Sequence, residues 1–593
     1  MPEACLGIEK SISGKTWQLR LDATGERLAE GLAQSQGISE LAGRVLAGRG
    51  VTAETAETFL NPTIAQDLPD PSQFKDMDKA AKRLADAIEA GEQVAVFGDY
   101  DVDGATSSAL LKRYFRQVSE VPLEVYIPDR QREGYGPNTA AMLQLKENGA
   151  KVVITVDCGT MSYEPLKAAK DAGLDVIVAD HHKAEADLPQ AFAIVNPNRV
   201  DEKSDFGNLA AVGVTFLLVV ALNRELRQRG VFEGRKLPDL LSLLDIVALG
   251  TVADVVALTG LNRTFVAQGL KMMAKRQNTG LAALSDVARL DGPPNTYHLG
   301  FLLGPRVNAG GRVGESSLGA ELLSTEDTVE AKRISLVLDI YNKERQEIEA
   351  GVEAEALAQV FPEMEADKSP IVFAHDKGWH PGVIGIVAGR LREKFNRPAL
   401  VFSIDEDGVA KGSARSMSGV DIGAAVLDAV HHKHLMAGGG HAMAAGLTLQ
   451  ADNLPGLKTF LEKKLGDAIT KARTSNTYRL DGVLSVKGAT LDLLDTLEAI
   501  GPYGQGHPAP RFALADVQLV AADVVGKNHV RLIFGGKDGG RLKAIAFRAA
   551  EEPLGQAFLS GLGKRFHVAG RLKRDEWQGV ARVDLLVEDA ALV

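Results

Sequence analysis

The stretch Val94-Ala95-Val96-Phe97, followed by Gly98-Asp99-Tyr100-Asp101-Val102-Asp103-Gly104, decides the fold class of this chain. The apolar run at its start is typical of a buried parallel strand. Three carboxylates follow the run at alternate positions. Because residues just past the strand ends line the ligand crevice of an open α/β sheet, we expect these acids to face a binding site.

Two further polar motifs follow apolar runs in the same way. Val152-Val153-Ile154 precedes Thr155-Val156-Asp157-Cys158-Gly159, and Val176-Ile177-Val178 precedes Ala179-Asp180-His181-His182. Helix-like patterns separate the predicted strands, and this βαβ rhythm predicts a parallel sheet. Carboxylates and imidazoles should therefore converge from three neighbouring strands, which indicates a site for hard cations with two metal ions.

The individual acids leave alternatives open. Asp101 and Asp103 point the same way if the turn after the strand stays extended, so both could share one ion. Asp99 could be a ligand, a partner of a ligand or a turn former. Asp254 lies in an apolar stretch with no basic residue nearby in sequence, and a buried carboxylate needs a partner such as a metal. The competing interpretation is a solvated acidic turn, with one core and one exposed histidine in the His181-His182 pair.

Composition sets the cellular context. At 593 residues the chain should form three or four domains, and 45% hydrophobic with 24% charged residues is ordinary for a soluble protein. Cys5 and Cys158 are the two cysteines, which excludes a disulfide framework and fits a reducing compartment. We expect a cytoplasmic protein without a membrane segment, because residues 209–222, the most apolar stretch, are too short to span a bilayer. The net charge of -11 argues against indiscriminate coating of nucleic acid.

Beyond the first α/β region, three more patterns organise the chain. Residues 328–360 contain no proline and one glycine, and they predict one long connecting helix. A second α/β unit begins with a strand at 370–374. After the glycine-rich run 501–506 the pattern changes to short alternating strands, including 529–534 and 566–572, which resemble a small β-barrel of the oligonucleotide-binding type.

The predicted barrel is basic within an acidic chain. Residues 511–593 contain 13 Lys+Arg against 10 Asp+Glu. Cations such as Lys527, Arg531 and Arg571 are interleaved with His529, as a groove for single-stranded nucleic acid requires. The alternative is an ordinary solvated β-surface.

Several motifs carry a family resemblance. GDYDVDG (98–104), VDCGT (156–160), ADHH (179–182) and GTVADVV (250–256) resemble the DHH phosphoesterase superfamily. The strings IPDR (127–130), GPRVNA (304–309), GSARS (412–416) and GGGH (438–441) resemble the RecJ family of single-strand-specific exonucleases in particular. The resemblance covers nearly the whole chain from about residue 40.

The resemblance implies a set of site residues. The implied metal ligands for two Mn²⁺ or Mg²⁺ ions are Asp101, Asp103, Asp157, His181 and Asp254. His182 is expected to face the scissile phosphate, and Asp99 is predicted as a second catalytic residue. Oxygen ligands with a minority of imidazoles suit these ions better than a structural zinc. Superfamily pyrophosphatases carry a histidine where this chain has Phe97, so the coordination of the first metal stays open.

A second set of residues is predicted to bind DNA. Individually each could be a surface ion-pair residue, but their place in glycine-flanked loops and the resemblance favour phosphate binding. The predicted residues are Arg130, Arg306, Asn308, Arg312, Ser413, Arg415, His441, Lys527, Arg531 and Arg571.

The fold class expected from the resemblance is α/β. It comprises a DHH-type parallel-sheet domain, a second α/β DHH-associated domain joined to it by a long helix, and a C-terminal OB-like β-barrel. The expected division is an N-terminal segment (1–45), the catalytic domain (46–326), the helix (327–362), the DHH-associated domain (363–472) and the OB domain (473–593).

The implied activity is metal-dependent 5′→3′ hydrolysis of single-stranded DNA to mononucleotides, in DNA repair and recombination. The implied partners are single-strand-binding protein and repair helicases, with the chain itself a monomer. One alternative is a DHH phosphodiesterase of small substrates such as oligoribonucleotides, against which the length and the barrel count. Another is a non-catalytic DNA-binding scaffold, against which the retained acids count.

Overall fold

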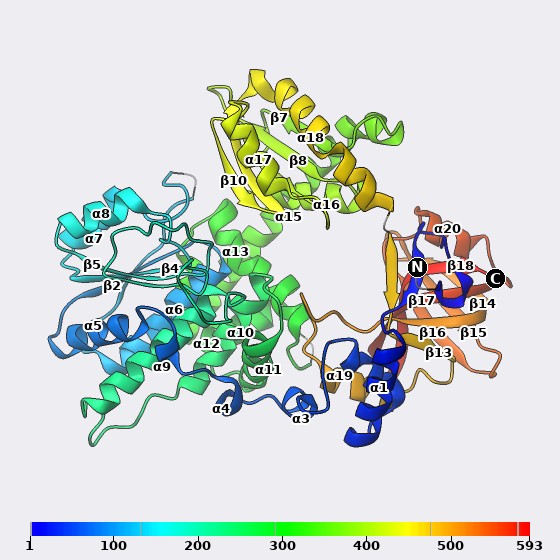
Figure 1. Cartoon of the computed structure of the whole chain (residues 1–593), viewed down its shortest axis with the longest axis horizontal. Helices are drawn as coiled ribbons and strands as arrows, with labels where there is room; N and C mark the ends of the chain where they lie inside the picture. Colours follow the sequence, from blue (N-terminus) through cyan, green and yellow to red (C-terminus); the bar gives the residue numbers. More distant parts are fainter. Residues whose placement is uncertain (1–2, 131, 291, 475, 578–579) are drawn as a thin grey trace. The chain divides into compact units, whose positions relative to one another are not determined.

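The computed structural model describes residues 3–130, 132–290, 292–474, 476–577 and 580–593. The chain folds into two compact units (Figure 1). The first unit comprises residues 1–307, 317–335 and 477–593, and the second comprises residues 308–316 and 336–476. None of the helices in these described ranges is long and apolar enough to cross a membrane.

A five-stranded, all-parallel sheet forms the centre of the first unit, in the order β3-β2-β4-β5-β6. Its strands are β2 (Val94–Gly98), β3 (Glu124–Tyr126), β4 (Val152–Val156), β5 (Asp175–Ala179) and β6 (Ala193–Val195). The three strands predicted before the polar motifs are therefore confirmed, and they are neighbours. Every residue of β2 and β4 is buried, as continuous apolar runs require.

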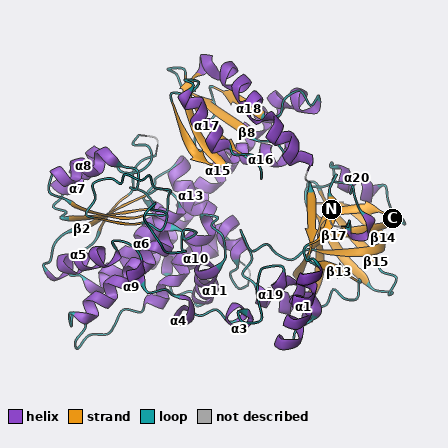
Figure 2. Ribbon diagram, viewed as in Figure 1, coloured by secondary structure: helices purple, strands orange, loops and turns teal. Residues whose placement is uncertain are grey.

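Helices cover both faces of this sheet (Figure 2). On one face, α7 (Thr139–Glu147) and α8 (Tyr163–Asp171) share an apolar core with the strands. On the other lie α5 (Met77–Glu89), α6 (Val102–Val118) and α9 (Ala211–Gln228). Both faces are thus closed to water, which leaves the strand ends as the accessible part of the sheet.

More helices follow in the first unit, and α10 is buried along most of its length. They are α10 (Leu244–Ala253), α11 (Gly260–Ala274), α12 (Thr279–Val287), the π-helix η4 (His298–Leu303), α13 (Gly304–Val313) and α14 (Leu318–Ser324). The 3₁₀ segments of the chain are η1 (Cys5–Gly7), η2 (Pro71–Gln73), η3 (Leu240–Leu243) and η5 (Ala451–Asn453).

The predicted C-terminal barrel is confirmed. Its sheet has the order β13-β14-β15-β16-β18-β17, and pairing of β14 with β17 closes it. Along β15, Val530, Leu532 and Phe534 are buried while Arg531 between them is exposed, the alternation of a one-sided sheet. The elements are β13 (Gly482–Leu484), α19 (Leu491–Ile500), β14 (Phe512–Val525), β15 (His529–Gly535), β16 (Arg541–Ala546), α20 (Pro553–Leu559), β17 (Arg565–Trp577) and β18 (Val580–Leu592).

The N-terminal residues differ from the separate segment expected over 1–45, because they share the core of the barrel. β1 (Thr16–Leu19) pairs in parallel with β12 (Thr477–Leu480). Trp17 is fully buried, and its Nε1 donates to Asp589 Oδ2 at 2.9 Å. Helices α1 (Ala23–Gln36) and α2 (Glu40–Ala47) pack in the same apolar cluster as the barrel strands. The short helices α3 (Ala56–Leu60) and α4 (Ile64–Asp67) follow.

The second unit contains a mixed sheet in the order β10-β11-β9-β8-β7. Its strands are β7 (Val372–Asp376), β8 (Ala399–Ile404), β9 (Val409–Arg415), β10 (Ala437–His441) and β11 (Ala444–Gln450), and its helices are α16 (Ile384–Phe395), α17 (Ile422–His431) and α18 (Leu454–Thr474). The predicted long helix is confirmed as α15 (Thr328–Glu365), which begins in the first unit. It runs beyond the expected end at 360 and includes Pro362 in its last turn.

Candidate metal centre

Three strands of the parallel sheet end at the same edge. Gly98 at the end of β2 lies beside Val156 of β4, and Val156 lies beside Ala179 of β5. The next residues are Asp99, Asp157 and Asp180, all nearly fully buried. Parallel register therefore brings the acids of the three motifs together, as the sequence indicated.

Asp101 is the N-cap of α6. Its Oδ1 accepts hydrogen bonds from the backbone N–H groups of Asp103 at 2.8 Å and Gly104 at 3.1 Å. The turn after β2 does not stay extended, because the helix begins at Val102. Asp101 and Asp103 therefore occupy different positions of a helix start, and the structure places them in two different ligand groups.

Asp103 is held by the start of α9. Its Oδ2 accepts from the N–H of Ala211 at 2.7 Å and its Oδ1 from the N–H of Val212 at 2.8 Å. Helix N-termini stabilise negative charge, so this arrangement fixes the carboxylate in a buried position. Oδ2 of Asp103 also lies 4.0 Å from His181 Nε2, in the same donor group as Asp254.

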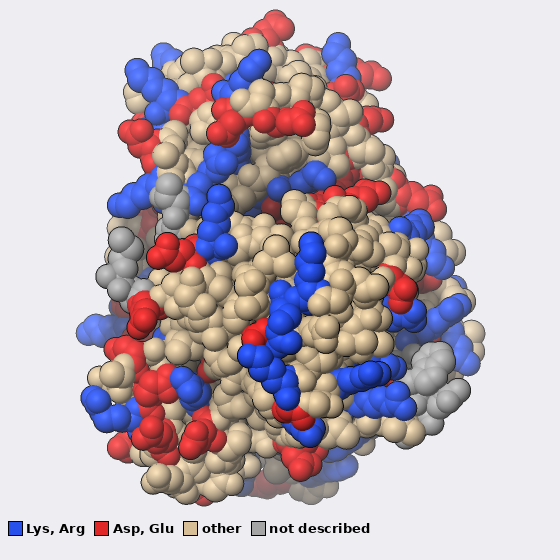
Figure 3. Space-filling model, turned by 90° about the vertical axis from the view of Figure 1, so that its right-hand side faces the viewer, with Lys and Arg blue, Asp and Glu red and all other residues tan. Residues whose placement is uncertain are grey.

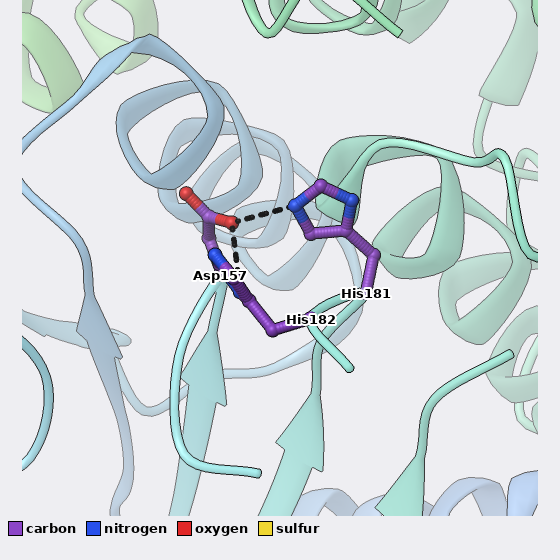
Figure 4. Close-up of side chains that lie close together, drawn as sticks. All are labelled: Asp157, His181 and His182. Carbon is purple, nitrogen blue, oxygen red and sulfur yellow. Dashed lines mark ion pairs between the residues drawn. The ribbon is translucent and has the colours of Figure 1, made fainter. Parts of the chain in front are cut away.

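His181 is the centre of one ligand group. Its Nδ1 lies 3.0 Å from the carbonyl oxygen of Leu209, which assigns the proton to Nδ1 and leaves Nε2 with a free lone pair. Nε2 is 3.3 Å from Asp157 Oδ1, 3.7 Å from Asp254 Oδ2 and 4.0 Å from Asp103 Oδ2 (Figure 4 shows the first pair). A lone pair facing three carboxylate oxygens is repulsive unless a cation lies among them.

Three overlapping groups of donor atoms result, and within each the atoms lie within 4.8 Å of one another. They are Asp103, His181 and Asp254; Asp99, Asp101 and Asp157; and Asp157, His181 and His182. Because Asp157 occurs in two of them, one carboxylate can serve two ions. Oδ1 of Asp99, Oδ1 of Asp157 and Oδ2 of Asp254 are buried without a hydrogen-bond partner, so the donor set fits hard cations.

Phe97 stands where superfamily pyrophosphatases carry a histidine. Its ring is fully buried and stacks against Tyr126 at 5.4 Å, so it belongs to the core of the sheet. Among the residues that the structure describes, the donor group that contains the acids after β2 is Asp99, Asp101 and Asp157. Asp99 therefore lies where it could serve as a metal ligand, which is one of the three roles that the sequence left open.

The clustered acids raise one another's pKa. Burial, followed by the charge of Asp101, raises the pKa of Asp99 and of Asp157 well above the ordinary value and that of Asp103 to about 7. Burial and the charge of Asp103 raise the pKa of Asp254 to about 9. A bound cation would lower these pKa values, because it stabilises every carboxylate in its ionised form.

Asp180 orients His182. Its Oδ1 accepts from His182 Nδ1 at 2.8 Å and from the N–H of His181 at 2.7 Å, and its Oδ2 accepts from the N–H of Thr160 at 3.1 Å. Burial opposes ionisation of Asp180, but the hydrogen bond and charge of His182 outweigh it and lower its pKa. Burial by itself would lower the pKa of His182. The hydrogen bond and charge of Asp180 outweigh burial, so the pKa of His182 is raised. Asn196 adds a hydrogen bond from its Nδ2 to the carbonyl of His182 at 2.8 Å.

An aromatic group borders the metal centre. The Tyr135 hydroxyl donates to the carbonyl of Asp157 at 3.0 Å and lies 3.3 Å from His182 Nε2. Tyr100 contacts Tyr135 edge-on, and the predicted DNA-binding residue Arg130 lies 5.1 Å from the centre of the Tyr100 ring. Asp180, Tyr135 and Tyr100 were not among the predicted site residues, although Asp180 and Tyr100 lie in the motifs ADHH and GDYDVDG.

Comparisons with known proteins identify the domains of this chain. Three family models match in order: the DHH family N-terminal domain over 93–251, the DHHA1 domain over 368–467 and the RecJ OB domain over 480–589. The single-stranded-DNA-specific exonuclease RecJ of Bacillus subtilis is 36% identical over 94% of this chain and 68% of its own length. That of Escherichia coli is 37% identical over 80% of this chain and 84% of its own length.

This chain belongs to the RecJ family. A crystal structure of RecJ from Thermus thermophilus in complex with Mn²⁺ superposes with a TM-score of 0.78 and 27% identity, over 97% of this chain and 78% of that one. The same protein in complex with Mg²⁺ gives a TM-score of 0.73 and 26% identity, again over 97% of this chain and 78% of that one. Relatives therefore bind both ions that the donor chemistry of this chain favours.

Predicted phosphate-binding residues of this RecJ-family chain gather in the second unit. Arg415 Nη1 lies 3.0 Å from Ser413 Oγ, and a Cβ added at Gly385 in the first turn of α16 would lie 3.0 Å from Ser413 Oγ and Arg415 Nη2. Arg312 Nη1 donates to the carbonyl of Gly382 at 2.9 Å, just before the same helix. A helix start flanked by guanidinium and hydroxyl groups suits a phosphate.

The other predicted DNA-binding residues of α13 and the second unit lie as follows. His441 is exposed at the end of β10, opposite Ala444, which pairs in turn with Arg415. Arg306 and Asn308 lie on α13, on the first-unit and second-unit side of the boundary respectively. Arg306 Nη1 donates to the carbonyl of Leu302 at 2.7 Å.

The three barrel residues have different surroundings. Lys527 is exposed in the turn between β14 and β15, and exposed Arg531 lies 3.2 Å from Asp523. Arg571 Nε instead lies 2.5 Å from Glu588 Oε1, whose other oxygen accepts from Arg511 at 2.8 Å. On the face of the molecule drawn in Figure 3, Lys and Arg side chains gather in a band across largely uncharged surface.

Proposed function

We propose that this chain is a metal-dependent exonuclease that hydrolyses single-stranded DNA in the 5′→3′ direction to mononucleotides, in DNA repair and recombination. The observation that carries the proposal is the position of His181 Nε2, within 4.0 Å of oxygens from Asp103, Asp157 and Asp254. The names of the RecJ relatives support single-stranded DNA as the substrate.

Two ligand sets would hold the ions. Asp99, Asp101 and Asp157 would bind one Mn²⁺ or Mg²⁺, and Asp103, His181 and Asp254 would bind the other. Ions bound there would supply an activated water and neutralise charge on the phosphodiester. Asp157 would also contact the second ion, since its Oδ1 lies 3.3 Å from His181 Nε2 and its carboxylate groups with His181 and His182 as well as with Asp99 and Asp101.

The residues around the metal ligands would bind and orient the scissile phosphate. His182 is fixed through Nδ1 by Asp180, which holds its imidazole at the edge of the ligand groups and keeps a proton on it. We assign His182 to the scissile phosphate and Asp180 to the orientation of His182. Tyr135 and Arg130 border the same edge, and the cation of Arg130 is placed to attract the strand.

Strand binding would extend beyond the centre. The proposed phosphate contacts in the α/β parts are Arg130, Arg306, Asn308, Arg312, Ser413, Arg415 and His441. The barrel would add Lys527, Arg531 and Arg571. The family resemblance further supports action as a cytoplasmic monomer, with single-strand-binding protein and repair helicases as partners.

Digestion of end-labelled DNA tests the proposal. With Mn²⁺ or Mg²⁺, a 5′-labelled single strand should release its label early as a mononucleotide, whereas a 3′ label should stay on shortening fragments. The matched duplex should resist. Early release of a 3′ label would contradict the polarity, and equal digestion of the duplex would contradict the substrate class. Asp157→Asn serves as the inactive control.

A further inference from the structure

Two stacked aromatic rings lie exposed at the π-helix η4 of the first unit, outside the ligand groups: Phe301 lies on η4 and Tyr297 is the residue immediately before it. The ring centroids of Tyr297 and Phe301 are 5.2 Å apart, and their planes differ by 24°. The two residues are 58% and 70% exposed. Large aromatic side chains gain stability from burial, so a flat pair left in water indicates a ligand that covers it.

This helix packs against the end of α10, immediately before the metal-ligand candidate Asp254. A Cβ added at Gly300 would lie 3.5 Å from Val252 Cγ1, and one added at Gly304 would lie 3.3 Å from Ala253 Cβ. η4 and the first residue of α13 therefore lie close against the end of α10. The aromatic pair is therefore carried by the element that lies directly against the helix end bearing Asp254.

Hydrogen bonds lie before and after the aromatic pair in the sequence. The Thr296 hydroxyl donates to the carbonyl of Tyr503 at 2.7 Å, and Leu258 N–H donates to the carbonyl of Gln505 at 2.8 Å. Both acceptors lie in the loop that leads into barrel strand β14. On the other side, Arg306 donates to the carbonyl of Leu302. A π-helix held in this way is an irregularity of the kind that recurs at functional sites.

We propose that Tyr297 and Phe301 form a platform on which unpaired bases of the DNA strand stack near the metal centre. The proposal rests on the proposed function, because it takes single-stranded nucleic acid as the occupant. Flat ring faces suit bases of any sequence, and Arg306 on the following helix supplies a cation for the backbone of a strand. A contact of this kind would position the strand without selecting its sequence.

The first test measures binding of full-length protein to a 5′-phosphorylated oligonucleotide in EDTA, so that no hydrolysis occurs. Phe301→Ala and Tyr297→Ala should each weaken binding by roughly tenfold, the effect expected for one stacked base. Phe301→Trp should restore it, whereas Phe301→Leu, which is apolar but not flat, should not. Since Phe301 is largely exposed, these changes leave the core intact.

The second test identifies the base concerned. Single abasic positions are moved along the oligonucleotide, and one or two of them should weaken binding by the wild type. Phe301→Ala should lose the dependence on those same positions, since the two changes remove one interaction. An equal loss for Phe301→Ala with normal and abasic strands would overturn the platform, as would normal binding by the variant.

The two proposals fail differently. If the wild type digests single strands and both aromatic variants bind and digest normally, the platform is wrong and the exonuclease stands. If the wild type neither binds nor digests single strands, the proposed function itself is wrong. Self-association of the wild type that Phe301→Ala abolishes, without any change in DNA binding, would assign the aromatic pair to a second copy of the chain.

Discussion

At the scale of single residues, Asp157 combines a strained backbone with a buried carboxylate that the neighbouring aspartates repel. Its φ of 60° lies in the left-handed region, which Asn and Asp tolerate better than most residues. Its Oδ1 is buried without a hydrogen-bond partner, 3.3 Å from His181 Nε2 and 3.9 Å from His182 Nδ1. Such strain persists where the surrounding structure imposes it, and functional sites are the common case.

Asp157→Asn should therefore change activity and stability in opposite directions. Asparagine keeps the shape and tolerates the positive φ, but removes the charge that both ligand groups share. Hydrolysis should fall by more than about a hundredfold, beyond the effect typical of residues that only support metal ligands. In EDTA the variant should unfold at a higher temperature than the wild type, because one of several clustered like charges is gone. A lower unfolding temperature in EDTA would contradict the repulsion.

Asp180→Asn tests whether His182 depends on its carboxylate partner. The amide keeps one oxygen for the backbone N–H groups but no longer holds a charged imidazole. Turnover should fall by roughly 10²-fold, within the range for a positioned acid or base, while bound Mn²⁺ per chain stays as in the wild type. His182→Ala should give a similar loss, and the double variant should add little to either. Loss of bound Mn²⁺ in Asp180→Asn would show that Asp180 positions the metal ligands rather than His182 alone.

The ligand candidates were visible in the sequence because each follows an apolar run or lies in one. Asp180 was not recognised as a site residue, since its role depends on a hydrogen bond to the second residue after it. Tyr135 was not recognised either, because the contact of its hydroxyl with the carbonyl of Asp157 joins two separate loops. Contacts of this kind have no periodic signal in a sequence.

At the scale of elements, the start of α6 determines that Asp101 and Asp103 belong to different ligand groups. Asp101 is a good N-cap residue, and this signal for a helix start was present in the sequence. The possibility that Asp101 and Asp103 share one ion rested on an extended turn and took no account of this signal. In the structure the first turn of the helix packs directly on the backbone of Asp99, with Gly104 at the point of contact.

Gly104→Ala should therefore disrupt the centre although it adds one methyl group. A Cβ at this position would lie 2.3 Å from the carbonyl oxygen of Asp99 and 2.6 Å from its N, and backbone cannot move aside cheaply. We expect loss of activity and of tight Mn²⁺ binding. Gly351→Ala in α15 is the matched control, since nothing lies within 4 Å of its added Cβ. It should be neutral or stabilising by about 0.5–1 kcal/mol, as measured by thermal unfolding.

The loop before β14 contains a buried histidine that should make the fold sensitive to acid. His507 is 2% exposed and stacks on Tyr503 at 5.0 Å. Burial, followed by the charges of Arg263 and Arg49, lowers its pKa to about 4. Because the unfolded value is higher, near 6.5, the unfolded state binds more protons between these values, and stability falls as the pH drops below about 6.5.

On this basis the wild type should be about 2 kcal/mol less stable at pH 5 than at pH 7 from this residue alone. His507→Phe keeps a flat ring without a titratable group. Its unfolding temperature should fall by a few degrees less than that of the wild type over the same pH interval. Parallel pH profiles of the two proteins would show that His507 is not the source.

At the scale of the whole molecule, the order of domains could be predicted and their assembly could not. The long helix, the second α/β sheet and the barrel were evident from composition and periodicity. The place of the N-terminal residues was not, because β1 finds its partner strand only at Thr477. Long-range pairing of this kind leaves no local signature. It also means that removing the barrel would expose the apolar faces of α1 and α2.

Point substitutions are therefore the sound test of DNA binding by the barrel. Lys527→Ala and Arg531→Ala remove exposed cations, so each should weaken binding of a long single strand and reduce the log–log salt slope by about 0.7. Arg571→Ala is the informative comparison. Its guanidinium is paired with Glu588, so its loss should lower the unfolding temperature more than the other two changes do.

The salt slopes of the Lys527, Arg531 and Arg571 variants can differ, and the differences would show where the DNA strand crosses the barrel. A reduced slope for Arg571→Ala, with no change in stability, would place the strand over Glu588 and Arg511. Unchanged slopes for Lys527→Ala and Arg531→Ala in folded protein would exclude the turn before β15 from the path of the DNA. The affinity would then have to come from the α/β parts, where Arg130 and Arg306 would carry the corresponding salt dependence in the same titration.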